Sequence, residues 1–164
     1  MKKHLYLLLL CLFLNISLFS NDDLNVSIKT YQNIDEQKIF NIIKKIYKDN
    51  SKDFIIDTSW DKLHIMERST NIFLTIGMQV DNIILSVLPT KDKNTTKLSL
   101  EIFSMIEDEK KLVSPDSQAH EIFWNRIEYA LGLDEEWIYC DKNLNSILHI
   151  AYPYCDITKD KLVP

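Results

Sequence analysis

Residues 72–106 read IFLTIGMQVDNIILSVLPTKDKNTTKLSLEIFSMI. Apolar residues occupy every second position over 72–80 and again over 98–102, which is the two-residue period of a strand with one buried face. Asp81 and Asn82 interrupt the apolar pattern, and their residue types are typical of a two-residue hairpin turn. The stretch therefore predicts antiparallel strands over 72–80, 83–88 and 98–106, with a hairpin turn at Asp81–Asn82 and a polar loop over 90–96.

Further strands are predicted before this stretch. Val26 and Ile28 alternate with polar neighbours in residues 24–31, and two more short apolar runs occupy 54–58 and 63–68. Gly77 stands alone in a predicted strand, where glycine marks a bulge or a close backbone contact.

Two helices are predicted by apolar residues at three- and four-residue steps. The first follows Asp35, a suitable N-cap, and places Ile39, Phe40, Ile42, Ile43, Ile46 and Tyr47 on one face. The second has Ser114 as N-cap, Pro115 at the first helical position and Gly132 at its end. Its apolar face comprises Ala119, Ile122, Phe123, Ile127, Ala130 and Leu131.

The order of these elements predicts an α+β domain with two layers, in which an antiparallel sheet of four to six strands carries two main helices on one face. This β-α-β-β-β-β-α order is similar to that of helix-grip folds, but the similarity is one of topology and carries no function. With 164 residues the chain has the length of one domain. We expect a single domain over 21–164, ending in a tail from about residue 133.

Residues 1–20 have the pattern of a secretory signal peptide. Lys2 and Lys3 precede the apolar run 5–14, which is short for a membrane span, and polar residues follow it. We expect cleavage after Ser20, export to the periplasm and no membrane span in the mature chain. The alternative is an uncleaved anchor, because Leu18 is larger than the residue preferred at that position.

The composition excludes several classes of protein. With Gly77 and Gly132 as the two glycines, the chain cannot contain a Walker loop, a dinucleotide-binding GxGxxG or a GxSxG nucleophile elbow. The formal charge is −5, and without Lys2 and Lys3 it becomes −7, from 17 Lys and Arg against 24 Asp and Glu. This charge argues against nucleic acid as a partner.

Cys140 and Cys155 are the two cysteines that remain after the leader. An even pair in an oxidising compartment predicts a disulfide, which would tie down the C-terminal tail. Free thiols are the alternative. A metal site at Cys140, His149 and Cys155 is disfavoured because structural zinc sites use closely paired ligands such as CxxC.

The sequence contains no recognisable catalytic or metal-binding motif. The spacing of His64, His120 and His149 is not that of metal ligands. The sequence also lacks the strained turn that presents a serine nucleophile in a catalytic triad. We therefore predict no catalytic residue, no metal and no cofactor, and consider an enzyme less favoured than a binding protein.

Candidate binding residues are Trp60, in a polar turn between strands, and Trp124, Arg126 and Tyr129 on the second helix. These types are frequent in interfaces, and the last three fall partly off the apolar face of the helix. The alternative for Trp124 is packing at the border of the helix under the tail.

The second face of the sheet is also predicted to carry apolar side chains, namely Phe73, Ile84, Leu88, Phe103 and Met105. Such a face needs cover. The tail, with Leu144, Ile147, Leu148, Ile150 and Tyr152, is one candidate, and an envelope protein or an apolar ligand is another.

Two segments, Asp23–Ser27 and Asp92–Thr96, fit the pattern D/E-x-N-x-S/T without proline at either x position. They resemble the acceptor sites of bacterial periplasmic oligosaccharyltransferases, which implies N-glycosylation at Asn25 and Asn94. The sequence thus favours a small periplasmic protein that acts by binding, as an envelope interaction module or a ligand carrier. The alternatives are an enzyme whose site one sequence does not reveal and a structural accessory of the envelope.

Overall fold

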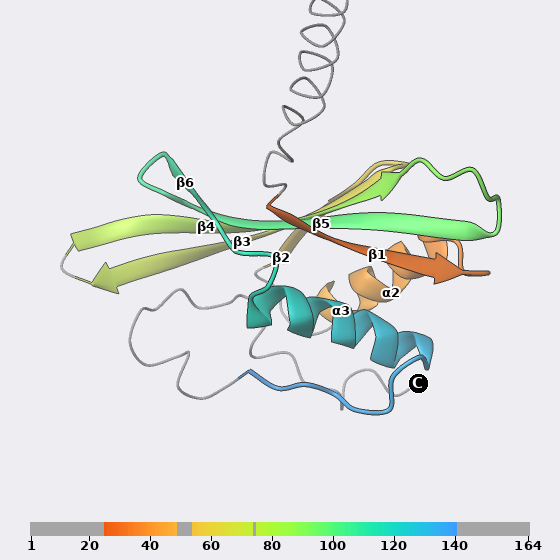
Figure 1. The fold of residues 1–164 in the computed structure, drawn as a ribbon. Coiled ribbons are helices and arrows are strands. Elements are labelled where there is room, and N and C mark those ends of the chain that lie inside the picture. Colours follow the sequence, from red (N-terminus) through yellow and green to blue (C-terminus); the bar gives the residue numbers. More distant parts are fainter. Residues whose placement is uncertain (1–24, 49–53, 74, 141–164) are drawn as a thin grey trace, which may run out of the picture.

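The computed structural model describes residues 25–48, 54–73 and 75–140. They form a six-stranded antiparallel sheet and two helices that both lie on one face of it (Figure 1). This confirms the predicted two-layer α+β fold. The elements are β1 (Val26–Gln32), α2 (Glu36–Lys48), β2 (Phe54–Thr58), β3 (Lys62–Phe73), β4 (Thr75–Leu88), β5 (Thr95–Ile106), β6 (Glu109–Leu112) and α3 (Gln118–Leu131).

The strands are ordered β1-β5-β4-β3-β2, and β6 pairs with β5 beyond the end of β1. In the centre of the sheet Leu63 pairs with Leu85, and Ile83 pairs with Ile102. These four side chains are at most 3% exposed. They form the sheet's contribution to the core, on the face that the helices cover.

β4 runs unbroken through Asp81 and Asn82, so the hairpin turn predicted there is wrong. Both side chains are buried and have partners on neighbouring strands. Asp81 accepts a hydrogen bond from the Ser104 hydroxyl of β5, and Asn82 Oδ1 lies 2.9 Å from His64 Nε2 of β3. Because these partners satisfy the polar groups inside the sheet, the two residues remain in a strand.

A two-residue turn does occur between β5 and β6. Glu107 and Asp108 have φ angles of 49° and 67°, the left-handed values of a type I′ turn. β6 was not among the predicted strands, because Glu-Asp lacks the glycine that usually marks such a turn.

The helices bury most of the predicted apolar residues. α2 buries Ile39, Phe40, Ile43, Ile46 and Tyr47, with Ile42 half-buried. α3 buries more than the predicted face: besides Ala119, Ile122, Phe123 and Ile127 it buries His120, Trp124, Asn125 and Arg126, whereas Ala130 and Leu131 are half-buried. Asp35 caps α2, since the Lys38 N–H donates to its Oδ1 at 2.8 Å.

The start of α3 differs from the prediction, whereas its end agrees with it. α3 begins at Gln118 instead of next to Ser114, because a turn with a Ser117 N–H to Ser114 O bond of 3.0 Å comes first. Gly132 ends the helix as predicted, with a left-handed φ of 74° that glycine adopts without strain.

The predicted leader, Cys155 and the tail residues 141–164 lie outside the described residues. Within the described part of the chain, no helix has the length and apolar character needed to cross a membrane.

Candidate functional site

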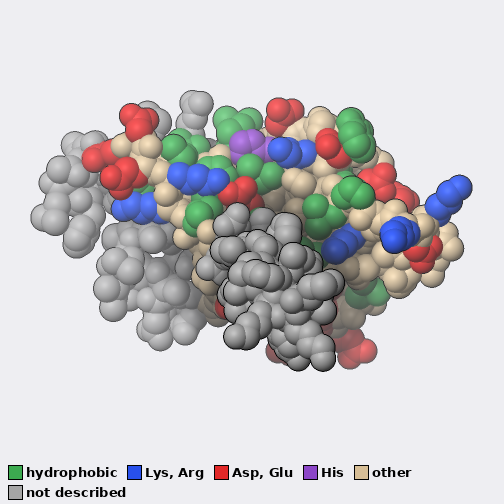
Figure 2. Space-filling model, turned by 45° about the horizontal axis from the view of Figure 1, so that its top comes forward, with side chains coloured by type: hydrophobic (Ala, Val, Ile, Leu, Met, Phe, Trp, Pro, Cys, Tyr) green, Lys and Arg blue, Asp and Glu red, His purple; other side chains and the backbone are tan. Residues whose placement is uncertain are grey.

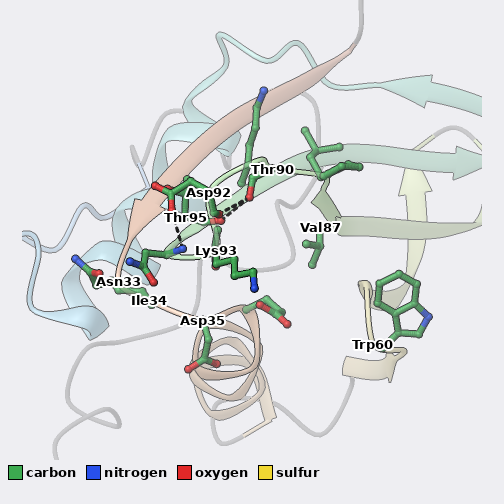
Figure 3. A pocket seen from close by; sticks show the side chains of 15 residues that line it. Asn33, Ile34, Asp35, Trp60, Val87, Thr90, Asp92, Lys93 and Thr95 are labelled. Atoms are coloured by element: carbon green, nitrogen blue, oxygen red, sulfur yellow. Dashed lines mark hydrogen bonds between the residues drawn. The ribbon is translucent and has the colours of Figure 1, made fainter.

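A surface hollow of about 560 Å³ lies where the turn after β1 meets the loop between β4 and β5. It is lined by residues 33–36, 87–90 and 92–97, with Trp60 at one side, and we call it the Trp60 hollow. Figure 3 shows Trp60 and Val87 on one side of this space and Asn33 on the other. Three segments that are distant in the sequence therefore build the hollow.

Trp60 projects from the tight turn that connects β2 to β3. The Ser59 N–H donates to Lys62 O at 2.8 Å, and the Ser59 hydroxyl donates to Asp61 Oδ1 at 2.9 Å. The Val87 N–H donates to Asp61 O at 2.8 Å, which attaches the turn to the end of β4. The indole is 80% exposed although its backbone is held in place. Trp60 thus keeps its place as a candidate binding residue.

Asp92 organises the loop on the other side of the hollow. Its Oδ1 accepts the Asn94 N–H at 2.9 Å, and its Oδ2 accepts the Thr95 hydroxyl at 2.9 Å. The Thr90 hydroxyl donates to Thr95 O at 3.0 Å and closes the loop. The hydrogen bonds from Asn94 and Thr95 lower the pKa of Asp92 below its ordinary value, so its carboxylate is ionised and already engaged.

The turn between β1 and α2 forms the third part of the lining. Asn33 has a left-handed φ of 58°, and its N–H donates to Asn94 O at 2.7 Å, which connects this turn to the loop. Asp35 uses Oδ1 as the cap of α2. Among the described residues, the Asn33 amide, Asp35 Oδ2 and the Lys93 ammonium form no hydrogen bond or ion pair with another side chain or with the backbone. These three groups are available to a ligand.

Charges around the hollow are nearly balanced. Asp35, Glu36 and Asp92 carry three negative charges, and Lys93 and Lys97 carry two positive ones. No histidine or cysteine is found among the described residues of the lining. The described residues also contain no cluster of three potential metal ligands. The arrangement places hydrogen-bonding and charged groups beside an exposed indole, which is suited to binding a molecule.

The structure does not bring Trp124, Arg126 or Tyr129 to the Trp60 hollow. Trp124 is 4% exposed and Arg126 is 1% exposed, so the two lie in the core, and packing is the alternative that the structure supports for Trp124. The Trp124 Nε1–H donates to Ser27 Oγ at 2.7 Å. Trp124 and Arg126 both lie partly off the apolar face, which suggested exposure. Trp124 instead packs against β1, where its ring meets the Tyr31 ring, and Arg126 is covered by the chain after α3.

That covering segment is residues 133–140, which turn back along α3 (Figure 1). The Trp137 ring lies 5.0 Å from the Arg126 guanidinium carbon and meets the half-buried Tyr129 ring edge-to-face at 5.4 Å. Asn125 holds the segment, since its amide donates to Asp134 Oδ2 at 2.9 Å and accepts from the Ile138 N–H at 2.8 Å. Arg126 and Trp137 are buried and Tyr129 is half-buried, so this cluster is part of the packing.

Cys140 ends the described segment. It is half-buried against the core and is not a free thiol. Cys155 lies outside the described residues, so the bond between the two cysteines stays a prediction.

The two predicted glycosylation sites differ in their surroundings. Asn25 is half-buried directly before β1, whereas Asn94 is exposed and borders the Trp60 hollow. Thr96, the hydroxyl residue of the second site, is 8% exposed because it pairs with Tyr31 of β1. Modification at Asn25 and Asn94 stays a prediction.

The outer face of the sheet, away from the helices, does carry apolar side chains. Ile28, Ile55 and Leu112 are 45–46% exposed. Figure 2 shows hydrophobic side chains on this face interspersed with charged ones. Lys110 covers part of it, since its Nζ lies 4.1 Å from the Phe103 ring centre and 2.5 Å from Glu101 Oε1. The tail residues predicted to cover this face lie outside the described residues.

Sequence reasoning missed Asn33, Asp35 and Lys93 as site residues. Asp35 was predicted as a helix cap, and the other two lie in ordinary polar turns. Their proximity depends on the pairing of β1 with β5, from Val26–Glu101 to Gln32–Thr95. No local pattern encodes that pairing, although an isolated Trp in a polar turn was a usable signal.

Comparisons with known proteins add no function. No family model matches the chain, and no characterised protein matches it. A crystal structure of a DUF4468 family protein from Bacteroides ovatus is similar over 84% of this chain and 78% of that one, at 14% sequence identity. Its TM-score is 0.29, which is too low to support an argument about this chain.

Proposed function

We propose that this chain is an exported periplasmic protein that acts by binding, and that the Trp60 hollow holds its ligand. The observation that carries the proposal is an indole that is 80% exposed beside a space of about 560 Å³. Large exposed aromatic rings are characteristic of binding sites because their apolar area is recovered on contact. The predicted leader supports export, and the charge of −7 disfavours nucleic acid as the ligand.

The chemistry of the hollow favours binding over catalysis. A catalytic acid or base needs a pKa near the working pH, commonly raised for a carboxyl by burial. The pKa of Asp92 is shifted in the opposite direction, by hydrogen bonds that build its own loop. Within the sheet, the buried Asp81 accepts a hydrogen bond from the Ser104 hydroxyl, so this pair is engaged in holding the strands together.

We further propose that Cys140 and Cys155 are bonded in the mature protein and that Asn25 and Asn94 are glycosylated where the pathway exists. A glycan on Asn94 would stand at the edge of the Trp60 hollow, since this residue belongs to its lining. Occupancy of Asn94 therefore bears directly on access to the site.

Photocrosslinking in intact cells tests the proposal. A benzophenone amino acid replaces Trp60 in one variant and Tyr139, which is 54% exposed in the segment after α3 and does not line the hollow, in a matched control. Position 60 should give a defined adduct, identified by mass spectrometry, that position 139 does not give. The experiment is repeated with Asn94→Gln to remove any attached glycan.

Identical adducts from both positions would contradict the proposed function. So would the absence of an adduct from position 60 both in the protein that retains Asn94 and in the Asn94→Gln variant. Either result would mean that no molecule is held at the hollow in the cell.

A further inference from the structure

We infer that the ligand of the Trp60 hollow is a neutral saccharide, one ring of which stacks on Trp60 while its hydroxyls bond to Asn33, Asp35 and Lys93. The inference rests on the proposed function, because it names the class of ligand for the same site. It follows from the combination of one flat apolar surface with several hydrogen-bonding groups.

The apolar surface is the indole of Trp60. The other two tryptophans, Trp124 and Trp137, are 4% and 5% exposed and take part in the core. Trp60 has no such packing, and its turn is fixed by the Ser59 and Asp61 hydrogen bonds. A rigid, exposed indole offers a flat face on which the C–H groups of a sugar ring can pack with little loss of side-chain entropy.

The opposite side of the hollow offers polar groups of three kinds. The Asn33 amide both donates and accepts, Asp35 Oδ2 accepts, and the Lys93 ammonium donates. Figure 3 shows the Lys93 side chain reaching into the space between Asn33 and Trp60. Sugar hydroxyls both donate and accept, so they match a mixed set of this kind, as a purely acidic or purely basic ligand would not.

The charge balance favours a neutral ligand. An anion in the hollow would be repelled by the carboxylates of Asp35, Glu36 and Asp92. A cation there would be repelled by the ammonium groups of Lys93 and Lys97. Ile34, Val87, Leu88 and Pro89 add apolar area to the lining, but a fully apolar ligand would also remove water from the polar groups without replacing their hydrogen bonds. A molecule with one apolar face and neutral hydroxyl edges avoids these costs.

Binding is measured by protection of Trp60 from iodide quenching, since the two buried indoles contribute little to quenching. The protein is produced under oxidising conditions, so that disulfides can form, in a host that lacks N-glycosylation. The neutral probes are triacetylchitotriose, maltotriose and cellotriose. Trigalacturonate serves as an anionic probe and a proline-rich decapeptide as a second ligand that stacks on tryptophan.

At least one neutral trisaccharide should protect Trp60 in a saturable manner. Trp60→Ala should raise the Kd of that trisaccharide about tenfold, which is a typical effect of losing one aromatic stack. The Kd of this variant is measured by calorimetry. Asn33→Gly should also weaken binding, and it preserves the turn because glycine adopts a positive φ freely. Tyr139→Ala is the control and should leave the Kd unchanged.

If none of the three neutral probes protects Trp60 from iodide at about 10 mM, the inference is overturned, because a Kd weaker than that does not amount to specific binding. Protection by the peptide or by trigalacturonate alone would overturn the saccharide while leaving the hollow as a binding site. Saccharide binding that Trp60→Ala and Asn33→Gly do not affect would place the ligand elsewhere and would overturn both.

Discussion

Ser27 joins the sheet to α3 by accepting a hydrogen bond from Trp124 Nε1–H at 2.7 Å while lying 2.6 Å from His120 Nδ1. Because the hydroxyl oxygen accepts from the indole, its own hydrogen is available for the imidazole nitrogen. Lys29, two residues on, pairs with Glu128 of α3 at 2.6 Å. The polar side of β1 therefore faces the helix, and Ile28 faces outward.

Truncation of Phe123 should strongly destabilise the fold. The side chain is 1% exposed, and its ring lies 6.0 Å from the Tyr47 ring and 5.8 Å from the Trp124 ring. Phe123→Ala should lower the free energy of unfolding by about 3–5 kcal/mol, measured by urea denaturation. Tyr139→Ala, at an exposed aromatic residue, should change it by less than about 0.5 kcal/mol. Unchanged stability of Phe123→Ala would show that α3 packs through another face.

His120 should make the protein less stable in mild acid. Burial is the main cause that lowers the pKa of His120 below 6.5, against smaller opposing effects of the Val113 carbonyl and Asp116. The unfolded chain then binds more protons than the folded one as the pH falls from about 6.5 toward the lower folded pKa. Stability is therefore greatest above that range and is lost on acidification.

The comparison is between wild type and His120→Gln, which retains a hydrogen-bonding side chain beside Ser27. Urea denaturation at about pH 7.5 and about pH 5.5 should show a smaller loss of stability in the variant. An equal loss in both proteins would show that His120 does not cause the effect.

At the scale of the elements, local pattern predicted both helices and the presence of antiparallel strands, but it misplaced the connection between β3 and β4. β3 ends at Phe73 and β4 begins at Thr75, inside the single strand predicted over 72–80. Two further turns were also misjudged. Asp81–Asn82 looks like a hairpin turn and lies inside β4, whereas Glu107–Asp108 lacks glycine and forms one. In both cases the partners on neighbouring strands decide the outcome, and a local pattern does not contain them. α3 likewise begins after Ser117 because the preceding residues form a separate turn.

The loop between β4 and β5 allows a sharp test of glycosylation at Asn94. In a strain that glycosylates other proteins, the native protein should be heavier than the bare polypeptide by at least one glycan, measured by intact mass. Asn94→Gln should lose one glycan. Asp92→Asn should lose it too, while retaining a side-chain oxygen for the Asn94 N–H that holds the turn.

Because Thr96 is buried within β5, we expect transfer to Asn94 to take place before β5 has paired with β1. A native mass equal to that of the bare polypeptide, in such a strain, would contradict modification at both Asn25 and Asn94.

At the scale of the molecule, the predicted disulfide would fix the chain that follows α3. Thiol labelling of denatured, unreduced protein should modify neither Cys140 nor Cys155, and reduction should expose both. A closed loop of about 15 residues should add about 3 kcal/mol to the free energy of unfolding. Stoichiometric labelling of both cysteines without reduction would rule out the bond.

The candidate site was only partly predictable. Trp60 could be singled out because a large aromatic residue in a polar turn has no local partner. Asn33, Asp35 and Lys93 could not, because the pairing of β1 with β5 and the hydrogen bond from Asn33 N–H to Asn94 O bring the two turns together only in the folded sheet. Trp124 and Arg126 were misjudged as surface candidates because their burial depends on contacts outside the helix. β1 packs against Trp124, and segment 133–140, which has no periodicity, covers Arg126.

Hydroxyl-radical footprinting of Trp60 is the most direct test of binding at the hollow. Oxidation is compared between the envelope fraction of intact cells and the purified, dialysed protein. Tyr139 is the exposed reference, and Trp124 and Trp137 are the buried ones. The account predicts that Trp60 is protected in the envelope fraction and becomes oxidised after purification, while the three reference residues do not change. Equal oxidation of Trp60 in both preparations would contradict it.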